Sequence, residues 1–549
     1  MKNFTNISQG LRKTASEYPH KRAVVYPAGR DAKGKVLYSQ ITFRQLDKES
    51  DRIAYGLEKA GIQRGTRTVL MVPPSMEFFH IIFAMFKTGA IPVVVDPGMG
   101  VDRMVTCFSK GKPEAFIAIP KAHLLRILKP KFFKSVKKCV TVGRRLLPGG
   151  HTLDSLRVDR DEPYPCARTT KNETAAIVFT TGSTGPAKGV VYTHGNFDAQ
   201  IKQISTHFAI RGDEIDLPTF PLFALFDPAL AMTAVIPDMD PTRPAKANPE
   251  KIIEAVQNHG VTNMFASPAL LHRVGRYCKE NGIKLDSLRR VVSAGAPVSP
   301  ADIEQFSSVL TGDAEIHTPY GATEAVPVIS IASSEILSET RHLSEKGFGI
   351  CIGRPILNTD VKIIKITDDP VTQLRDNHCL SSGEVGEIIV KAPLVTKHYF
   401  DDRNEDTLAK IPDSSEGIWH RMGDLGWMDK KGRIWFCGRK NHRVETGKET
   451  LFTIPCESIF NNHENVFRSA LAGVGKKGGQ TPVIFVEPVA GEIDEKTLLE
   501  ELYRIAGSSP LTSDIRHIFI KKDLPVDIRH NSKIFREKLS GTAEKLIRQ

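Results

Sequence analysis

Short apolar runs alternate with a helical pattern over much of the first 300 residues. Residues 76–88 have the apolar spacing of a helix. The strand-like runs occupy residues 67–71, 91–95, 115–119, 175–181, 263–266 and 290–293. Such alternation is typical of doubly wound α/β layers. Another helix is expected after Asn248, because Pro249 suits a first helical position.

The pattern changes towards the C-terminus. Residues 383–391 and 432–438 resemble shorter strands separated by turns, so a β-rich portion is expected before Arg439. After Arg439, a small α+β domain is predicted from strand-like runs at 469–474, 481–486 and 515–520 and a helix at 494–506. Since 549 residues are too many for one core, we predict an α/β protein with an N-terminal domain at 1–439 and a C-terminal domain at 440–549.

Composition narrows the class of protein. The eight cysteines form no Cys-x-x-Cys pair and are expected to be free thiols, as in a cytoplasmic protein. A signal peptide is not expected, because the first residues contain no apolar signal core. A membrane span is not expected either, because the most apolar stretch, residues 81–95, is broken by Lys87, Gly89 and Pro92. Nucleic-acid binding is not expected, since no binding module accompanies the net charge of +12.

Much of that positive charge lies between Lys110 and Arg145. Here Lys129, Lys131, Lys134 and the following basic residues alternate with apolar ones. A solvated helix face is the first interpretation, and a docking surface for anionic lipid headgroups or a protein partner is the alternative.

Residues 177–192 are the most informative stretch, because a Gly/Ser/Thr loop joins two apolar runs. Glycines let backbone amides turn towards an anion, while hydroxyls and Lys188 add further ligands for phosphate. The loop residues are Thr180, Thr181, Gly182, Ser183, Thr184 and Gly185. It is no Walker A loop, because Gly189 and a β-prone run follow the lysine. We expect a polyphosphate site, with an ordinary turn as the alternative.

Two further motifs combine small, aromatic and acidic residues. Gly295, Ala296 and Pro297 form a small-residue turn after a predicted strand, against which a flat ring could lie. Residues 319–325 then bring together Tyr320, Gly321, Thr323 and Glu324. Tyr320 could stack on a base, and the oxygens of Thr323 and Glu324 suit Mg²⁺. A Glu after Thr is also common at the start of a helix, which is the competing interpretation.

The remaining motifs lie near the C-terminus. Asp424 stands at a Gly turn and could accept hydrogen bonds from a ribose diol, or simply cap the turn. Arg439 follows the next predicted strand. Lys533 closes a polar loop before a basic helix and would on its own be an ordinary surface lysine.

Together, in this order, these motifs resemble the ANL superfamily of adenylate-forming enzymes over nearly the whole chain. The resemblance implies ATP and Mg²⁺ as cofactors and a mobile C-terminal domain. It makes 180–189 the pyrophosphate loop, 295–297 the adenine shelf and Tyr320 the stacking residue. Thr323 and Glu324 would lie at the α-phosphate and metal, and Asp424 and Arg439 at the ribose. Lys188 and Lys533 would be catalytic, Lys533 being the mobile lysine.

The sequence departs from the family pattern at two places. Asn441 occupies the hinge position where many members have Asp or Lys, and asparagine still tolerates unusual backbone angles. Ala224 stands where many members have a His or aromatic gate, which puts the usual entry of an acceptor such as CoA in doubt.

Local signatures at 220–230, 235–244 and 526–534 are similar to the olefin-pathway β-lactone synthetases. This implies ATP-dependent closure of a long-chain β-hydroxy acid, with other enzymes of that pathway and a peripheral membrane contact as partner hypotheses. The alternatives are a fatty acyl-CoA synthetase or fatty acyl-AMP ligase, and a non-catalytic nucleotide-binding scaffold.

The acyl pocket and the general base are less well defined by the sequence. His530 is a candidate base, with a solvent-facing loop histidine as the alternative. An acyl pocket or ordinary core packing would equally explain the apolar residues Phe220, Phe223, Leu225, Phe226 and Leu230.

Overall fold

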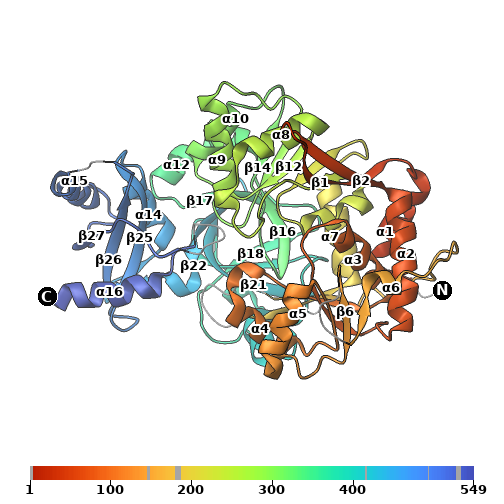
Figure 1. Ribbon diagram of the computed structural model, residues 1–549. Helices are drawn as coiled ribbons and strands as arrows, with labels where there is room; N and C mark the ends of the chain where they lie inside the picture. The colour runs from red at the N-terminus through yellow and green to blue at the C-terminus, as the bar shows by residue number, and fades with distance from the viewer. Residues whose placement is uncertain are drawn as a thin grey trace.

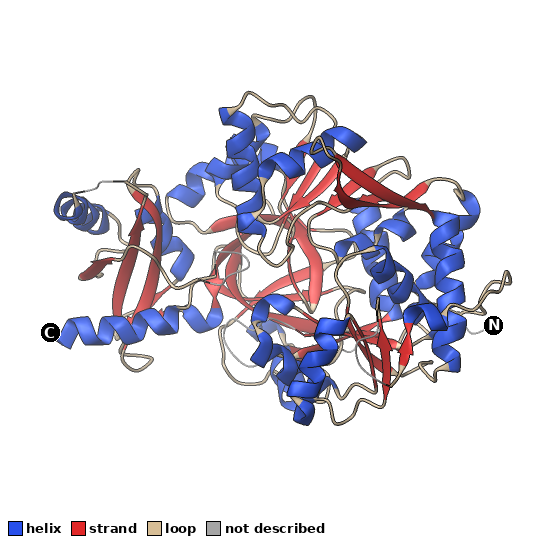
Figure 2. Cartoon of the chain, viewed as in Figure 1, coloured by secondary structure: helices blue, strands red, loops and turns tan. Residues whose placement is uncertain are grey.

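The computed structural model describes residues 4–144, 149–179, 187–413, 417–491, 494–526 and 533–548. A large body carries a smaller C-terminal lobe, seen in blue on the left of Figure 1. Figure 2 shows strands of the large body enclosed by helices, as expected for an α/β protein. No helix in these ranges is long and apolar enough to cross a membrane.

Two mainly parallel sheets form the first part of the large body. One has the order β14-β13-β12-β10-β11-β1-β2, antiparallel only between β1 and β2. Its strands are β1 (Arg22–Arg30), β2 (Val36–Thr42), β10 (Ile215–Pro218), β11 (Thr233–Val235), β12 (Asn263–Ala266), β13 (Arg290–Ser293) and β14 (Glu315–His317).

The second sheet has the order β7-β6-β5-β3-β4-β8-β9, antiparallel only between β8 and β9. Its strands are β3 (Arg67–Met71), β4 (Ile91–Val95), β5 (Ala115–Ala118), β6 (Lys138–Thr141), β7 (His151–Thr152), β8 (Thr174–Phe179) and β9 (Gly189–Thr193). The phosphate-loop sequence therefore connects two neighbouring antiparallel strands.

Helices cover both sheets. They are α1 (Ser8–Glu17), α2 (Phe43–Lys59), α3 (Met76–Thr88), α4 (Val101–Gly111), α5 (Pro120–Leu128), α6 (Leu153–Leu156), α7 (His194–His207), α8 (Pro249–His259), α9 (Pro268–Glu280) and α10 (Pro300–Ser307). Helix α3 is buried from Phe78 to Thr88 and packs in the cores of both sheets, which explains why it is apolar on all sides. The Ser75 hydroxyl caps its first turn, and Gly89 ends it at φ 74°.

An antiparallel sheet follows, in the order β15-β16-β17-β22-β21-β19-β18 with β20 beside β21. The strands are β15 (Tyr320–Ala322), β16 (Ala325–Ser330), β17 (Ile350–Pro355), β18 (Asp360–Ile364), β19 (Gly386–Lys391), β20 (Lys410–Pro412), β21 (Ile418–Met428) and β22 (Ile434–Arg439). The accompanying helices are α11 (Ser333–Glu335), α12 (Arg341–Glu345) and α13 (Arg403–Ala409). This is the β-rich portion expected before Arg439.

The C-terminal lobe is built on β25 (Val466–Val474), β26 (Thr481–Pro488) and β27 (His517–Ile520), with β26 in the middle. Its helices are α14 (Thr453–Asn461), α15 (Glu495–Ser508) and α16 (Arg536–Arg548), and β23 (Val444–Glu445) pairs with β24 (Thr450–Leu451). Two apolar clusters lie on opposite sides of the sheet, one under α14 and α15 and the other under α16. The predicted small α+β arrangement is confirmed.

The basic segment is not the single helix face that its sequence suggested. Helix α5 ends at Leu128, and a short 3₁₀ turn, Pro130–Phe132, leads into irregular chain before β6. Pro130 accounts for the break, because the residue before a proline is disfavoured in helical geometry. Arg145 lies outside the described residues.

Candidate active site

A cavity of about 1230 Å³ lies where the two parallel sheets, the antiparallel sheet and the C-terminal lobe meet. Its wall includes apolar side chains from α3, α4 and α7 together with the charged residues Lys188, Glu324, Arg439 and Lys533. A cavity with an apolar part and a few convergent polar groups is the usual form of a small-molecule binding site.

Thr323 and Glu324 lie in the turn between β15 and β16, and both line the cavity. This is a β-hairpin and not the helix start that was the competing interpretation. A Cβ at Gly321 would approach the Ala325 carbonyl oxygen to 2.5 Å, so the hairpin requires a glycine there. The Tyr192 hydroxyl donates to the Thr323 carbonyl oxygen and fixes the turn from the side of β9.

The Glu324 carboxylate is held by a tyrosine that the sequence analysis missed. Tyr399 donates its hydroxyl to Glu324 Oε1 at 2.7 Å, and both side chains are buried. Burial, followed by the Glu324 charge, raises the pKa of Tyr399, so its hydroxyl remains a donor. The Lys410 ammonium lies over the Tyr399 ring, 5.3 Å from its centroid. Burial lowers the pKa of Lys410 to about 8.

Lys188 also lies beside this group. Its ammonium is 2.5 Å from Glu405 Oε2 and 5.5 Å from the centre of the Tyr399 ring. Both Lys188 and Glu405 line the cavity. The lysine is thus positioned by a carboxylate from α13, another contact that no sequence motif indicated.

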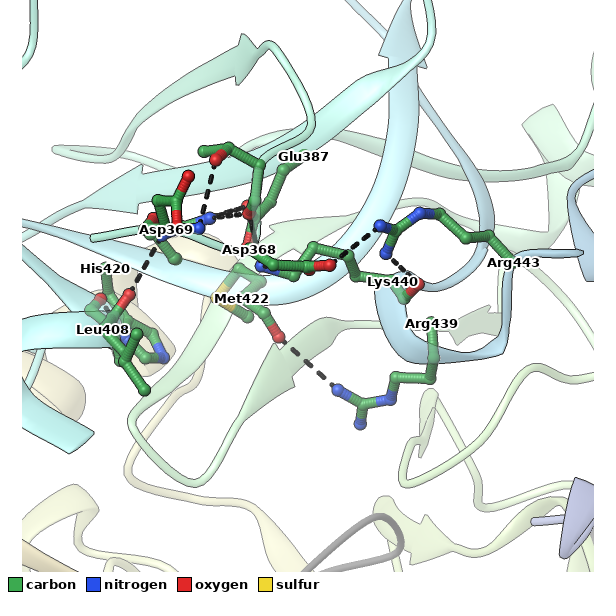
Figure 3. A network of polar contacts seen from close by, with 12 residues as sticks. Asp368, Asp369, Glu387, Leu408, His420, Met422, Arg439, Lys440 and Arg443 are labelled. Atoms are coloured by element: carbon green, nitrogen blue, oxygen red, sulfur yellow. Dashed lines mark hydrogen bonds and ion pairs between the residues drawn. The ribbon is translucent and has the colours of Figure 1, made fainter. Parts of the chain in front are cut away.

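Tyr320, Asp424 and Arg439 are brought together by strands β15, β21 and β22. The Tyr320 hydroxyl donates to Asp424 Oδ2 at 2.6 Å, and Arg439 Nη1 lies 3.1 Å from Asp424 Oδ1. Burial raises the pKa of Asp424, opposed by the positive charge of Arg439 and by the Tyr320 hydrogen bond. In Figure 3, Arg439 reaches the Met422 carbonyl oxygen, which lies 3.4 Å from its Nη1.

The small-residue turn follows β13, as predicted. Gly295 lines the cavity and has φ 99°, a backbone conformation that favours glycine. Ala296 and Pro297 continue the turn towards α10.

A buried ion pair lies in the cavity wall. Arg421 Nη2 is 2.6 Å from Glu387 Oε2, and both side chains are at most 2% exposed. Lys440 Nζ adds a contact of 3.3 Å to the same Glu387 oxygen, as the close-up in Figure 3 shows. The sequence did contain a signal for this pair, because Arg421 and Glu387 each interrupt an apolar strand and buried charges need partners.

Lys533 reaches the cavity from the C-terminal lobe. Its positive charge partly opposes the rise that burial causes in the pKa of Asp424. The lysine directly precedes Ile534, which forms an isolated bridge with Val526, and helix α16 begins at Arg536. The structure therefore brings it to the group formed by Tyr320, Asp424 and Arg439.

Several predicted residues lie outside the described residues. These are Thr180, Thr181, Gly182, Ser183, Thr184, Gly185 and His530. The strands before and after the phosphate-loop sequence are described, and Phe179 and Lys188 at its two ends both line the cavity.

The apolar candidates divide into two groups, because Leu230, unlike the other four, does not line the cavity. Phe220, Phe223, Leu225 and Phe226 line the cavity, and the Phe223 ring packs edge-on to Phe265 at 4.5 Å. Ala224, by contrast, is fully buried in the core and does not face the cavity, whereas its neighbour Phe223 does. An aromatic ring is therefore present at the wall next to Ala224.

The comparisons with known proteins agree with this geometry. The family model for AMP-binding enzymes matches residues 11–400. The chain belongs to this family of adenylate-forming enzymes. It is 45% identical over 542 residues to the olefin β-lactone synthetase of Stenotrophomonas maltophilia (strain K279a), covering 97% of both chains.

Solved structures share the fold at low sequence identity. The amide bond synthetase McbA from Marinactinospora thermotolerans matches with a TM-score of 0.79 and 19% identity, over 98% of this chain and 99% of that one. The O-succinylbenzoate coenzyme A synthetase MenE from Bacillus subtilis, in complex with ATP and magnesium ion, has a TM-score of 0.75 and 19% identity, over 96% and 98%. The predicted α/β fold is thereby confirmed.

Proposed function

We propose that this enzyme activates a long-chain β-hydroxy acid with ATP and closes it to a β-lactone. The observation that carries the proposal is that Lys188, Glu324 and Lys533 line the same cavity as Phe78, Phe86 and Phe108. A charged nucleotide and an apolar chain would thus meet in one site. The 45% identity to an olefin β-lactone synthetase supports the same reaction.

The polar part of the cavity is assigned to ATP. In this proposal the turn at Gly295, Ala296 and Pro297 receives the adenine beside Tyr320, and Asp424 and Arg439 bind the ribose. The loop 180–185 and Lys188 bind the phosphates. Support comes from the arrangement of Tyr320, Asp424 and Arg439, whose polar atoms converge within hydrogen-bonding reach of one another.

The residues present also fit Mg²⁺. Glu324 and Thr323 offer hard oxygen ligands at the cavity, and Mg²⁺ typically takes only one or two carboxylates in addition to phosphate oxygens. When bound, the ion would neutralise charge on the phosphates during displacement. In this proposal the hydrogen bond from Tyr399 orients the Glu324 carboxylate for binding Mg²⁺.

The first step forms an acyl adenylate. A carboxylate oxygen of the acid attacks the α-phosphorus of ATP, the bond to the bridging oxygen breaks, and pyrophosphate leaves. Lys533 is assigned to the charge that develops on the α-phosphate and carboxylate, since a preoriented cation lowers that barrier. The residue already lines the cavity near Asp424 in this structure.

The second step is intramolecular. The β-hydroxyl oxygen attacks the activated carbonyl carbon, the bond to AMP breaks, the hydroxyl proton passes to a base or solvent, and AMP leaves with its electron pair. Holding the hydroxyl against the carbonyl replaces a bimolecular reaction, which is a large gain from positioning alone. No thiol acceptor is needed for this step.

We also propose that residues 1–439 and 440–549 move as separate domains about Asn441. The residue lies in the 3₁₀ turn Lys440–His442 and lines the cavity, so rotation there would carry Lys533 towards or away from the site. Such hinges are a common form of domain closure.

Product identification tests the proposal. Purified enzyme is incubated with ATP, Mg²⁺ and a long-chain β-hydroxy acid, with and without CoA, and products are identified by mass. We expect a product lacking one water relative to the acid, in equal yield without CoA. A thioester formed only with CoA would instead establish a fatty acyl-CoA synthetase, and an adenylate that accumulates unchanged would indicate an acyl-AMP ligase.

A further inference from the structure

Helix α5 exposes aliphatic side chains on its outer face. Leu124, Ile127 and Leu128 are 45%, 47% and 78% exposed, and Leu128 is the most exposed large hydrophobic residue in the described part of the chain. Val101 at the start of α4 is 50% exposed. Scattered single residues of this kind are ordinary, but three within one helix turn and a half form a patch.

The patch is surrounded by positive charge. Residues 110–144 contain ten lysines and arginines and one acidic residue, Glu114. Lys121 shares the exposed face of α5, and Lys131, Lys134 and Lys137 are exposed in the chain that follows. Two nearby carboxylates form ion pairs with lysines of this region, Asp102 with Lys129 and Asp401 with Lys112.

The inner faces of the same helices line the cavity. Met104 and Phe108 come from α4, Ile119 precedes α5 and Ala122 belongs to it, and all four lie in the cavity wall. Figure 1 shows α4 and α5 next to each other at the lower edge of the large body. The exposed patch is therefore the outer side of the wall that borders the apolar part of the site.

We infer that this surface, formed by α4, α5 and residues 129–137, docks on an anionic lipid bilayer. Aliphatic anchors ringed by lysines are the composition of interfacial segments, whose binding adds apolar burial to attraction by anionic headgroups. The exposed lysines Lys121, Lys131, Lys134 and Lys137 complement the diffuse negative charge of a membrane. Only the advantage of such docking rests on the proposed function: the enzyme would gain access to an acid dissolved in the lipid.

Vesicle flotation without nucleotide tests the inference separately from catalysis. The full-length enzyme is mixed with phosphatidylcholine vesicles or with vesicles that contain about 30 mol% phosphatidylglycerol, at about 0.1 M salt. We expect binding to the anionic vesicles to be at least about tenfold stronger, and to weaken as salt rises to about 0.5 M.

Matched variants identify the surface. Leu124→Ser combined with Leu128→Ser, and separately Lys131→Glu combined with Lys134→Glu, should each reduce binding to anionic vesicles by about tenfold. Leu357→Ser, which alters a residue 56% exposed elsewhere, should bind like the wild type. Pyrophosphate exchange with a water-soluble acid should be unchanged in all of them, which shows that the variants fold.

Three outcomes would overturn the inference: no flotation with anionic vesicles, equal binding to neutral ones, or wild-type binding by both double variants. If the double variants lose a protein partner while vesicle binding persists, the surface serves that partner instead. Flotation without any exchange activity would leave this inference standing and refute the proposed function.

Discussion

At the scale of single residues, the contact between Tyr399 and Glu324 gives the first prediction. Tyr399→Phe removes one hydrogen bond to a buried carboxylate, a loss of about 1 kcal/mol. We expect the Mg²⁺ concentration for half-maximal pyrophosphate exchange to rise about fivefold. Tyr503→Phe, which removes a hydroxyl of α15 that is hydrogen-bonded to the backbone of Arg516 and Ile518, is the control. An unchanged Mg²⁺ requirement would remove Tyr399 from the metal site.

Lys533 gives the second prediction. Lys533→Ala should fold normally and lose about 10²- to 10³-fold in acid-dependent pyrophosphate exchange, as when a preoriented donor is deleted from an oxyanion hole. Lys545→Ala, an exposed lysine on the following helix, should keep wild-type exchange. Matching thermal unfolding would show that both variants are folded, and near-wild-type exchange in Lys533→Ala would contradict its catalytic role.

The sequence indicated some of these residues and not others, for a physical reason. Thr323, Glu324 and Asp424 lie in short motifs whose residue types suggest phosphate, metal and sugar chemistry. Tyr399, Lys410 and Glu405 reach the same place only because β20 and α13 fold back against β9 and β21. No local sequence pattern indicates that these segments fold back, so the proximity of these residues to Glu324 could not be predicted.

At the scale of elements, a pair of buried acids links strand β10 to the turn after it. Asp216 faces Asp227, Asn263 and the ion pair of Glu214 with Arg290. Burial raises the pKa of Asp216 to about 7 and that of Asp227 as well, against an unfolded value near 4. Folding therefore takes up protons between about pH 4 and 7, and stability must fall as pH rises through that range.

Asp216→Asn tests this linkage. The wild-type free energy of unfolding should fall between about pH 4 and 7, and the variant should reduce that fall by about 2 kcal/mol. Urea unfolding at intervals across this range measures it. Asp313→Asn, in an exposed turn, should follow the wild-type pH dependence. Parallel curves for wild type and Asp216→Asn would show that Asp216 does not titrate in this way.

Regular elements were the most predictable part of the fold. The runs at 67–71, 76–88, 91–95, 263–266 and 290–293 match β3, α3, β4, β12 and β13 residue for residue. Their apolar runs are distinct because the strands lie inside the two parallel sheets and α3 is buried between the cores of both. The basic segment was predicted wrongly, because charge alternation outweighed the helix-breaking effect of Pro130.

At the scale of the whole molecule, Asp368 connects the large body to the C-terminal lobe. It lies after β18, and its carboxylate is 3.0 Å from Arg443 Nη2 and 3.5 Å from Lys477 Nζ. Figure 3 shows the contact between the Asp368 carboxylate and the Arg443 guanidinium. As an ion pair that is half exposed, it should contribute at most about 1 kcal/mol to the present arrangement.

Asp368→Ala should therefore loosen the connection between the domains without unfolding either. We expect amide hydrogen exchange across residues 440–443, followed by mass spectrometry, to accelerate by about three- to fivefold. Asp369→Ala is the matched control, because Asp369 accepts from Arg421 through its backbone oxygen, which the change preserves. Equal exchange in both variants would mean that the Asp368 contacts do not hold the lobe.

Arg439 and Lys440 are consecutive residues with different attachments. Arg439 contacts Asp424, while Lys440 contacts Glu387 in the cavity wall. Any swing of the lobe twists the backbone directly beside the arginine. Release of the spent nucleotide and reopening of the enzyme would then occur together. The backbone between Arg439 and Lys440 would therefore set the rate of turnover.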